Sequence, residues 1–132
     1  MDIIRRNTDY ALRAMAHLAK NYGGREAVST RVIAEREDIS YQLACKLMQK
    51  MNAAGLVKST MGPKGGFVLS RDPKKINLLE IIEAVQGPMT VNRCVGKDHS
   101  CPRKDSCPLS CKMSQMQGDI VGFLSNSKLS DL

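Results

Sequence analysis

The sequence predicts a mainly α-helical fold with one small β-hairpin. The chain has 132 residues, no tryptophan and two phenylalanines, so its core must consist mostly of Leu, Ile, Val, Ala and Met. Apolar residues recur at helical spacing along much of the chain, whereas a glycine-rich turn between two short apolar segments stands at residues 61–66. This length suits one domain with one appended element, and we place the boundary between residues 1–90 and 91–132.

The first helix is predicted to start at an N-cap on Thr8 and to continue to about Lys20. Ala11, Met15 and Leu18 share one face of this helix, so that face should pack into the core. The glycines at positions 23 and 24 should end the helix region.

The next two helices are predicted to form a helix-turn-helix. Ser29 or Thr30 is placed to cap a short second helix, and a tight turn at Ile39 separates it from the third. Ser40 should cap the third helix, and Gly55 should follow its last turn as a C′ glycine. Two short helices joined by about four residues are typical of this motif.

A β-wing should follow the third helix. Residues 56–60 and 67–70 are predicted strands, and the turn between them is rich in glycine. A further amphipathic helix is expected over residues 76–86, ending at Gly87-Pro88. The fold class is therefore mainly α with a small β-wing, a winged helix-turn-helix.

The third helix has two different faces. The face expected in the core is formed by Leu43, Leu47, Met51 and Ala54. The opposite face is formed by Gln42, Cys45, Lys46 and Gln49. Glutamine and lysine can bond to base edges in the major groove, while serine and tyrosine at a helix start suit phosphates. The predicted DNA-contacting residues, wing included, are Ser40, Tyr41, Gln42, Lys46, Gln49, Lys58, Lys64 and Gly65.

The positive charge lies in the part of the chain that contains this motif. The net charge is +7, and residues 1–75 contain fourteen Lys and Arg against seven Asp and Glu. Residues 76–132 contain six of each, so their net charge is zero. A solvated basic surface would give the same count, but next to a winged helix the charge favours double-stranded DNA as the partner.

Four cysteines lie within eighteen residues: Cys94, Cys101, Cys107 and Cys111, with the spacing C-x6-C-x5-C-x3-C. Proline follows two of them, and the residues between them are polar without an apolar period. Cys-Pro pairs in such loops are typical of iron–sulfur sites. We found no signal peptide or membrane span, so we expect a cytoplasmic location, where clustered thiols bind metals rather than form permanent disulfides.

Several segments together resemble one family, the cysteine-bearing winged-helix regulators that include the iron–sulfur cluster regulator IscR and the nitric-oxide-responsive repressor NsrR. The matching segments are Thr8-Asp9-Tyr10-Ala11-Leu12-Arg13, Ile39-Ser40, Ala54-Gly55-Leu56-Val57, Gly62-Pro63-Lys64-Gly65-Gly66-Phe67, residues 77–87 and Arg93-Cys94. The resemblance implies a homodimer in which a long C-terminal dimerisation helix, here from about Lys112 to Ser125, crosses to the partner. It also implies a near-palindromic operator, probed by one winged helix from each subunit.

The chain departs from IscR-like members at four places. Met61 stands where they have an arginine before the wing's Gly-Pro, and Cys45 stands where IscR has a glutamate. The first gap in the cysteine loop is one residue longer, and Ser110 replaces the histidine that is IscR's fourth ligand. The target sequence therefore does not carry over from those relatives.

Three residues compete for the fourth ligand position beside Cys94, Cys101 and Cys107. Cys111 is a soft thiolate that suits iron and is near in sequence. Asp9 matches the aspartate that NsrR-like proteins supply from the partner subunit, although a carboxylate in a first helical turn is also explained by the helix dipole. His99, among lysines and serines, is the third. Four thiolates, or three with a carboxylate, favour [4Fe-4S] over [2Fe-2S].

The function predicted from the sequence is a DNA-binding transcriptional regulator, a repressor by expectation, whose DNA affinity depends on an iron–sulfur cluster sensing iron, redox or nitric oxide status. Two alternatives remain: the same thiolates as a structural zinc site, and a metal-free thiol–disulfide switch. The sequence has no paired carboxylates, Ser/His arrangement or phosphate-binding loop that would predict an enzyme.

Overall fold

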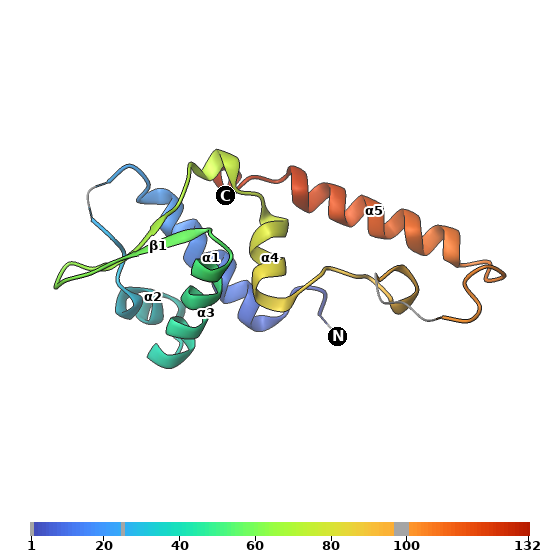
Figure 1. The fold of residues 1–132 in the computed structure, drawn as a ribbon, viewed down its shortest axis with the longest axis horizontal. Helices are drawn as coiled ribbons and strands as arrows, with labels where there is room; N and C mark the ends of the chain where they lie inside the picture. The colour runs from blue at the N-terminus through green and yellow to red at the C-terminus, as the bar shows by residue number, and fades with distance from the viewer. Residues whose placement is uncertain (1, 25, 97–100) are drawn as a thin grey trace.

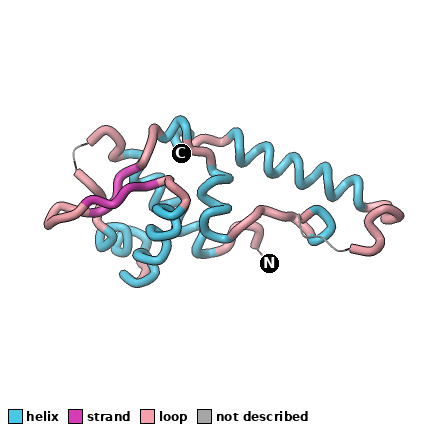
Figure 2. Tube along the Cα trace, in the orientation of Figure 1, coloured by secondary structure: helices cyan, strands magenta, loops and turns pink. Residues whose placement is uncertain are grey.

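The structure, a computed structural model, describes residues 2–24, 26–96 and 101–132. Figures 1 and 2 show that the described chain is mainly helical, with one two-stranded hairpin, as the sequence predicted. The longer helices and the strands, in chain order, are α1 (Arg6–Lys20), α2 (Thr30–Glu37), α3 (Tyr41–Ala53), β1 (Val57–Thr60), β2 (Gly66–Leu69), α4 (Leu78–Gln86) and α5 (Ser110–Asn126). The short 3-10 turns are η1 (Pro73–Lys75), η2 (Arg93–Val95) and η3 (Leu129–Asp131).

The elements form a globular end and a projecting helix. Helices α1–α4 and the hairpin gather at one end, and α5 extends away from them (Figure 1). The chain then returns, because the Leu129 N–H donates to the Ile76 carbonyl at 2.8 Å and the Leu78 N–H donates to the Ser127 carbonyl at 2.9 Å. These bonds fix the C-terminal end of α5 to the start of α4. None of the helices in the described ranges is long and apolar enough to span a membrane.

The main core is formed by aliphatic and methionine side chains, as the composition predicted. Its largest fully buried members include Met15, Met48, Met51, Leu56 and Ile81. A smaller cluster of Ile82, Met89 and Leu124 joins α4 to α5. Burying such side chains contributes about 1.5–3 kcal/mol each, so the two clusters hold the globular end together and attach α5 to it.

The predicted cap of the first helix is wrong. Helix α1 starts two residues earlier than Thr8, with Arg5 at the N-cap position and no side-chain cap. Thr8 lies inside the first turn and is fully buried, and its hydroxyl donates to Oε1 of Gln86 at 2.7 Å. A threonine near a helix start is favoured as a cap, but it can equally bury its methyl group and bond to a distant acceptor.

The predicted ends of α2 and α3 are confirmed. The Ser29 hydroxyl accepts a hydrogen bond from the Val32 N–H at 3.2 Å, and the Ser40 hydroxyl accepts one from the Leu43 N–H at 3.1 Å. Gly55 follows α3 with φ of +75°, a left-handed conformation that glycine adopts without a steric penalty. The caps fix where the recognition helix, α3, begins.

The buried face of α3 differs in part from the predicted one. Leu47 and Met51 are buried as expected, but the other buried residues of α3 are Ala44 and Met48. Ala54 is exposed, so its assignment to the core is wrong. Helix α3 ends at Ala53, and the residue at the C-cap no longer follows the helical face that packs against α1 and α4.

The wing is an antiparallel hairpin in the register Val57↔Leu69, Lys58↔Val68, Ser59↔Phe67 and Thr60↔Gly66. On its other side β2 bonds to Val28, whose N–H donates to the Phe67 carbonyl at 3.0 Å and whose carbonyl accepts from the Phe67 N–H at 2.8 Å. The Val28 carbonyl lies so close to Gly66 that a side chain there would clash with it. Glycine at this position therefore lets the segment before α2 pair with the wing.

Candidate nucleic-acid interface and thiol loop

The helix-turn-helix presents the predicted contact residues to solvent. Gln42, Lys46 and Gln49 are exposed on α3, and Ser40 is exposed at its N-cap. The Ser40 oxygen accepts the Leu43 bond, so its hydroxyl hydrogen is left to donate to a phosphate. Cys45, expected to face outward, is half-buried. The exposed face of α3 is therefore polar, with lysine as its charged residue.

Tyr41 stands at the start of α3 as a neutral hydrogen-bond donor. Its side chain is 53% exposed. The Cys45 thiol, one helical turn further on, raises the pKa of the Tyr41 phenol chiefly through a side-chain hydrogen bond, and Arg31 opposes that shift. The phenol therefore keeps its proton at neutral pH. Arg31, exposed on α2 near Tyr41, adds a cation that the sequence analysis did not single out.

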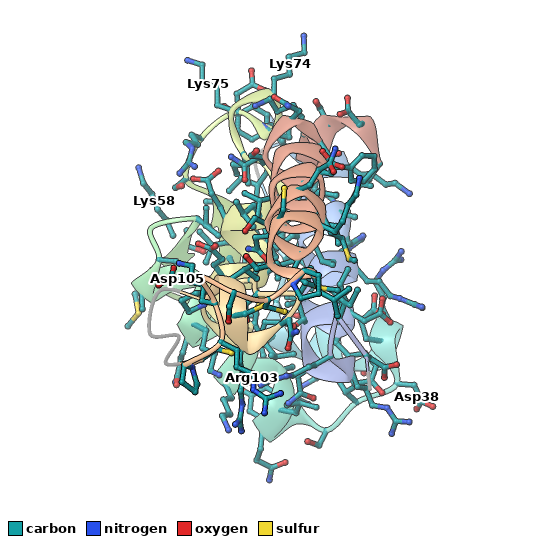
Figure 3. The ribbon with its side chains drawn as sticks, turned by 90° about the vertical axis from the view of Figure 1, so that its right-hand side faces the viewer. Asp38, Lys58, Lys74, Lys75, Arg103 and Asp105 are labelled. Carbon is teal, nitrogen blue, oxygen red and sulfur yellow. The ribbon has the colours of Figure 1, made fainter. Side chains whose placement is uncertain are left out.

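The wing presents its lysines beside the helix-turn-helix. Lys58 and Lys64 are exposed and Gly65 is half-buried. Lys64 and Gly65 line an open cleft of about 370 Å³ that Ser29 and Val32 of the α2 region also line. Figure 3 shows Lys58 projecting from the hairpin. The tip of the wing therefore lies close to the start of α2, so the two elements form a continuous surface.

The four clustered cysteines lie on three different segments. Cys94 is in η2, Cys101 and Cys107 are in the loop before α5, and Cys111 is in the first turn of α5. Within residues 101–109 the two cysteines are half-buried, whereas every other residue is exposed. All five cysteines of the chain are free thiols. The two thiols of the loop are therefore more covered than its charged side chains, such as Arg103 and Asp105 (Figure 3), whereas Cys111 is exposed.

The donor chemistry suits a soft metal centre, although one protomer does not bring the donors together. Three or four thiols in one polar loop are the ligand set that iron–sulfur clusters and zinc use. Within the described part of the chain, no three His, Cys, Asp or Glu side chains lie close enough to hold a metal ion. Asp9 forms an exposed ion pair with Arg13 at 3.2 Å. His99 lies outside the described residues.

The segment between α4 and η2 is held by a glutamine that sequence analysis did not single out. Gln117 of α5 accepts a hydrogen bond from the Val91 N–H at 2.8 Å through Oε1. Its Nε2 donates to the Met89 carbonyl at 2.6 Å. These bonds join residues 26 and 28 positions apart, and no local pattern signals them. They attach the start of the cysteine loop to α5.

Helix α5 has an apolar stripe that is only partly covered. Met113, Met116, Ile120 and Phe123 follow the 3-4-3 spacing of a coiled-coil seam. Met116 is 43% exposed and Phe123 is 70% exposed. Ile120 and Leu124, four residues apart on one side of the helix, pack with Ile82 and Met89, and Leu124 is buried. Ile120 thus lies at the edge of the face that attaches α5 to the globular end, and Met116 and Phe123 are the members of the stripe that are exposed.

A capped helix-turn-helix followed at once by a hairpin wing, on the basic part of the chain, defines a winged-helix DNA-binding protein of the transcriptional regulator class. The chain belongs to the Rrf2 family: the family model described as iron-dependent transcriptional regulator matches residues 4–132. The resemblance found in the sequence is confirmed, and this family consists of regulators rather than enzymes.

Named relatives agree with that assignment. The chain is 33% identical over 123 residues to the HTH-type transcriptional regulator IscR of Escherichia coli strain K12, which covers 93% of this chain and 75% of the relative. The structure of CymR, described as the global cysteine regulator of B. subtilis, superposes with a TM-score of 0.79 at 30% identity and covers 99% of this chain and 95% of that one.

Two further solved structures show the same fold. IscR of T. potens has a TM-score of 0.73 at 28% identity, over 97% of this chain and 83% of that chain. The oxidized form of CymR from Staphylococcus aureus has a TM-score of 0.74 at 26% identity, over 98% and 93% of the two chains. The mainly helical winged fold with its long C-terminal helix is therefore shared with this family.

Proposed function

We propose that this DNA-binding regulator is a repressor whose DNA affinity is controlled by an iron–sulfur cluster. The ligands are Cys94, Cys101 and Cys107, with Cys111 or the partner subunit's Asp9 completing the set. The observation that supports this most strongly is the cysteine loop, in which Cys101 and Cys107 are half-buried while the other side chains of residues 101–109 are exposed. A cluster bound there supplies a centre that responds to iron supply, oxidants or nitric oxide.

The DNA-contacting surface is formed by α3 and the wing. Gln42, Lys46 and Gln49 face the base edges of a major groove, because they are exposed on α3, the helix whose start is fixed by the Ser40 cap. Ser40 and Tyr41 donate to phosphates. Lys58, Lys64 and Gly65 of the wing lie over the neighbouring backbone.

The functional unit is a homodimer formed through α5. The exposed members of the stripe, Met116 and Phe123, need an apolar partner, and an identical helix crossing them supplies one. Two winged helices then reach successive major-groove faces about 34 Å apart, so the operator is near-palindromic.

Control of DNA affinity is a population shift between two arrangements of this dimer. The segment of residues 87–93 runs from α4, which contacts α3, to the first cysteine. Because Gln117 ties Met89 and Val91 to α5, rearrangement of the cysteine loop moves α5 and α4 relative to each other. That movement changes the separation of the two recognition helices.

The decisive experiment is a visible-range absorption spectrum of anaerobically purified protein, with iron, sulfide and zinc measured on the same sample. We expect a brown protein with stoichiometric iron and sulfide. A colourless protein containing one zinc per chain would replace the cluster with a structural zinc site. A colourless, metal-free protein would leave the regulator without a metal centre.

A metal-free thiol switch is the second candidate function. One related structure is described as an oxidized form of CymR, and here the five cysteines are all free. In that case thiol oxidation, measured by mass spectrometry, changes DNA affinity reversibly in protein that contains no metal.

A further inference from the structure

The first residues of the chain form a basic arm beside the recognition helix. The N-terminal arm, residues 2–6, contains Arg5 and Arg6, both exposed. Across the described residues, neither arginine forms an ion pair. Figure 1 shows this start of the chain on the same lower side of the molecule as α3. The arm therefore offers two free guanidinium groups near the helix that enters DNA.

The arm and α3 share one surface. Arg5, Arg6 and Lys50 line the same open cleft of about 350 Å³. Lys50 lies one helical turn after Lys46, one of the residues proposed to face the bases. Its Nζ donates to the Val85 carbonyl at 3.1 Å, which holds the end of α3 against α4. The two arginines thus continue the basic side of the recognition helix.

A single side chain fixes the arm in this place. Gln86, at the end of α4, accepts hydrogen bonds through Oε1 from the Arg5 N–H at 3.1 Å and from the Thr8 hydroxyl at 2.7 Å. Its Nε2 donates to the Ile3 carbonyl at 2.9 Å. The amide group therefore uses both its acceptor and a donor to hold a segment about eighty residues away in sequence.

We propose that the N-terminal arm is a second DNA-contacting element, in which Arg5 and Arg6 bind phosphates beside the groove that α3 enters, and that Gln86 is its positioning residue. Guanidinium groups pair with phosphate in a bidentate way, and a preordered backbone reduces the entropy lost on binding. The inference rests on the proposed DNA surface. It adds contacts that carry no sequence information, so they strengthen binding to any duplex.

The first test measures binding to a mixed-sequence duplex of about 25 base pairs by fluorescence anisotropy over a range of salt concentrations. The Arg5→Gln/Arg6→Gln variant should bind about 10- to 100-fold more weakly near 0.1 M salt, with a salt slope lower by roughly 1.8. The matched control is Lys74→Gln/Lys75→Gln, which removes the same charge from η1 at the opposite edge of the molecule (Figure 3). The control should keep nearly the wild-type slope.

The second test separates positioning by Gln86 from a general effect on folding. Gln86→Leu removes all three bonds, whereas Thr8→Val removes the threonine bond and leaves the arm bonded to Gln86. Gln86→Leu should lower the salt slope and speed hydrogen exchange at the Arg5 amide, while Thr8→Val should change neither. In the Arg5→Gln/Arg6→Gln background, Gln86→Leu should have no further effect on the slope.

Three results would overturn the proposal. In the first, the arginine variant and the lysine control lose the same affinity, so net charge alone explains the effect. In the second, the arginine variant sediments as a monomer, which assigns the arm to the subunit contact instead. In the third, the wild-type protein binds no duplex at all, which refutes the DNA surface itself rather than the arm alone.

Discussion

Thr8 shows how a single buried hydroxyl connects distant parts of the chain. It is fully buried, and its bond to Gln86 joins α1 to α4. Thr8→Val keeps the side-chain volume but removes the donor, so we expect a loss of about 1 kcal/mol in the free energy of unfolding. Urea denaturation measures this loss. Thr8→Ser keeps the hydroxyl donor and serves as the control for hydrogen bonding. If wild type and Thr8→Val had the same free energy of unfolding, the bond would contribute nothing to stability.

His17 should make the stability of the protein depend on pH. Burial, and then the charges of Arg36 and Lys20, lower the pKa of His17 below its ordinary value of 6.5. The unfolded chain therefore binds more protons than the folded one as the pH falls below 6.5, and folding loses stability there. The free energy of unfolding should fall as the pH is lowered through 6.5 toward the lower pKa of the folded state, and His17→Gln should reduce that fall. If the free energy of unfolding fell with pH by the same amount in His17→Gln as in the wild type, this role of His17 would be contradicted.

At the scale of elements, α3 is the part whose substitution should change sequence preference. Gln42→Ala and Lys46→Ala should each weaken binding to a duplex selected from a random pool by about 1–3 kcal/mol, with a smaller effect on mixed-sequence DNA. Lys74→Ala, on η1, is the control for charge. Equal losses on both duplexes would make Gln42 and Lys46 phosphate contacts.

The elements that local chemistry defines were predicted well, and those that depend on long-range bonds were not. Ser29 and Ser40 cap their helices because a serine oxygen reaches an N–H three residues on, which the sequence displays directly. Thr8 was misassigned because its partner, Gln86, is 78 residues away. The pairing of Val28 with β2 was missed for the same reason. In the candidate site, the sequence displays the spacing of the cysteines directly. It does not display the hydrogen bonds by which Gln117 of α5 holds Met89 and Val91 at the start of their loop.

At the scale of the whole molecule, α5 is the element through which we propose that the dimer forms. The exposed stripe of α5 implies that Phe123→Asp or Met116→Glu should convert a dimer into a monomer, measured by sedimentation velocity. In a dimer, binding of one winged helix to its half-site raises the effective concentration of the second winged helix at the other half-site. A monomeric variant loses this gain, so its affinity for the operator should also fall steeply. Lys112→Asp, on the exposed start of α5, changes charge without touching the stripe and should stay dimeric. A dimeric Phe123→Asp variant would place the subunit contact elsewhere.

In the proposed cluster site, the fourth ligand determines whether the sensor lies within one subunit or between two. If Cys111 is the ligand, all four thiolates come from one chain, and Cys111→Ala should bleach the visible absorption while Asp9→Ala leaves it intact. We expect this result, because a thiolate is the softer ligand for iron. Arg13→Ala is the matched control for Asp9→Ala, since it breaks the same exposed ion pair but keeps the carboxylate. A stable cluster in Cys111→Ala together with its loss in Asp9→Ala would assign the site to both subunits. The start of α1 would then join the DNA-binding end directly to the partner's cysteine loop, and DNA affinity would lose its dependence on the cluster in the Asp9→Ala variant.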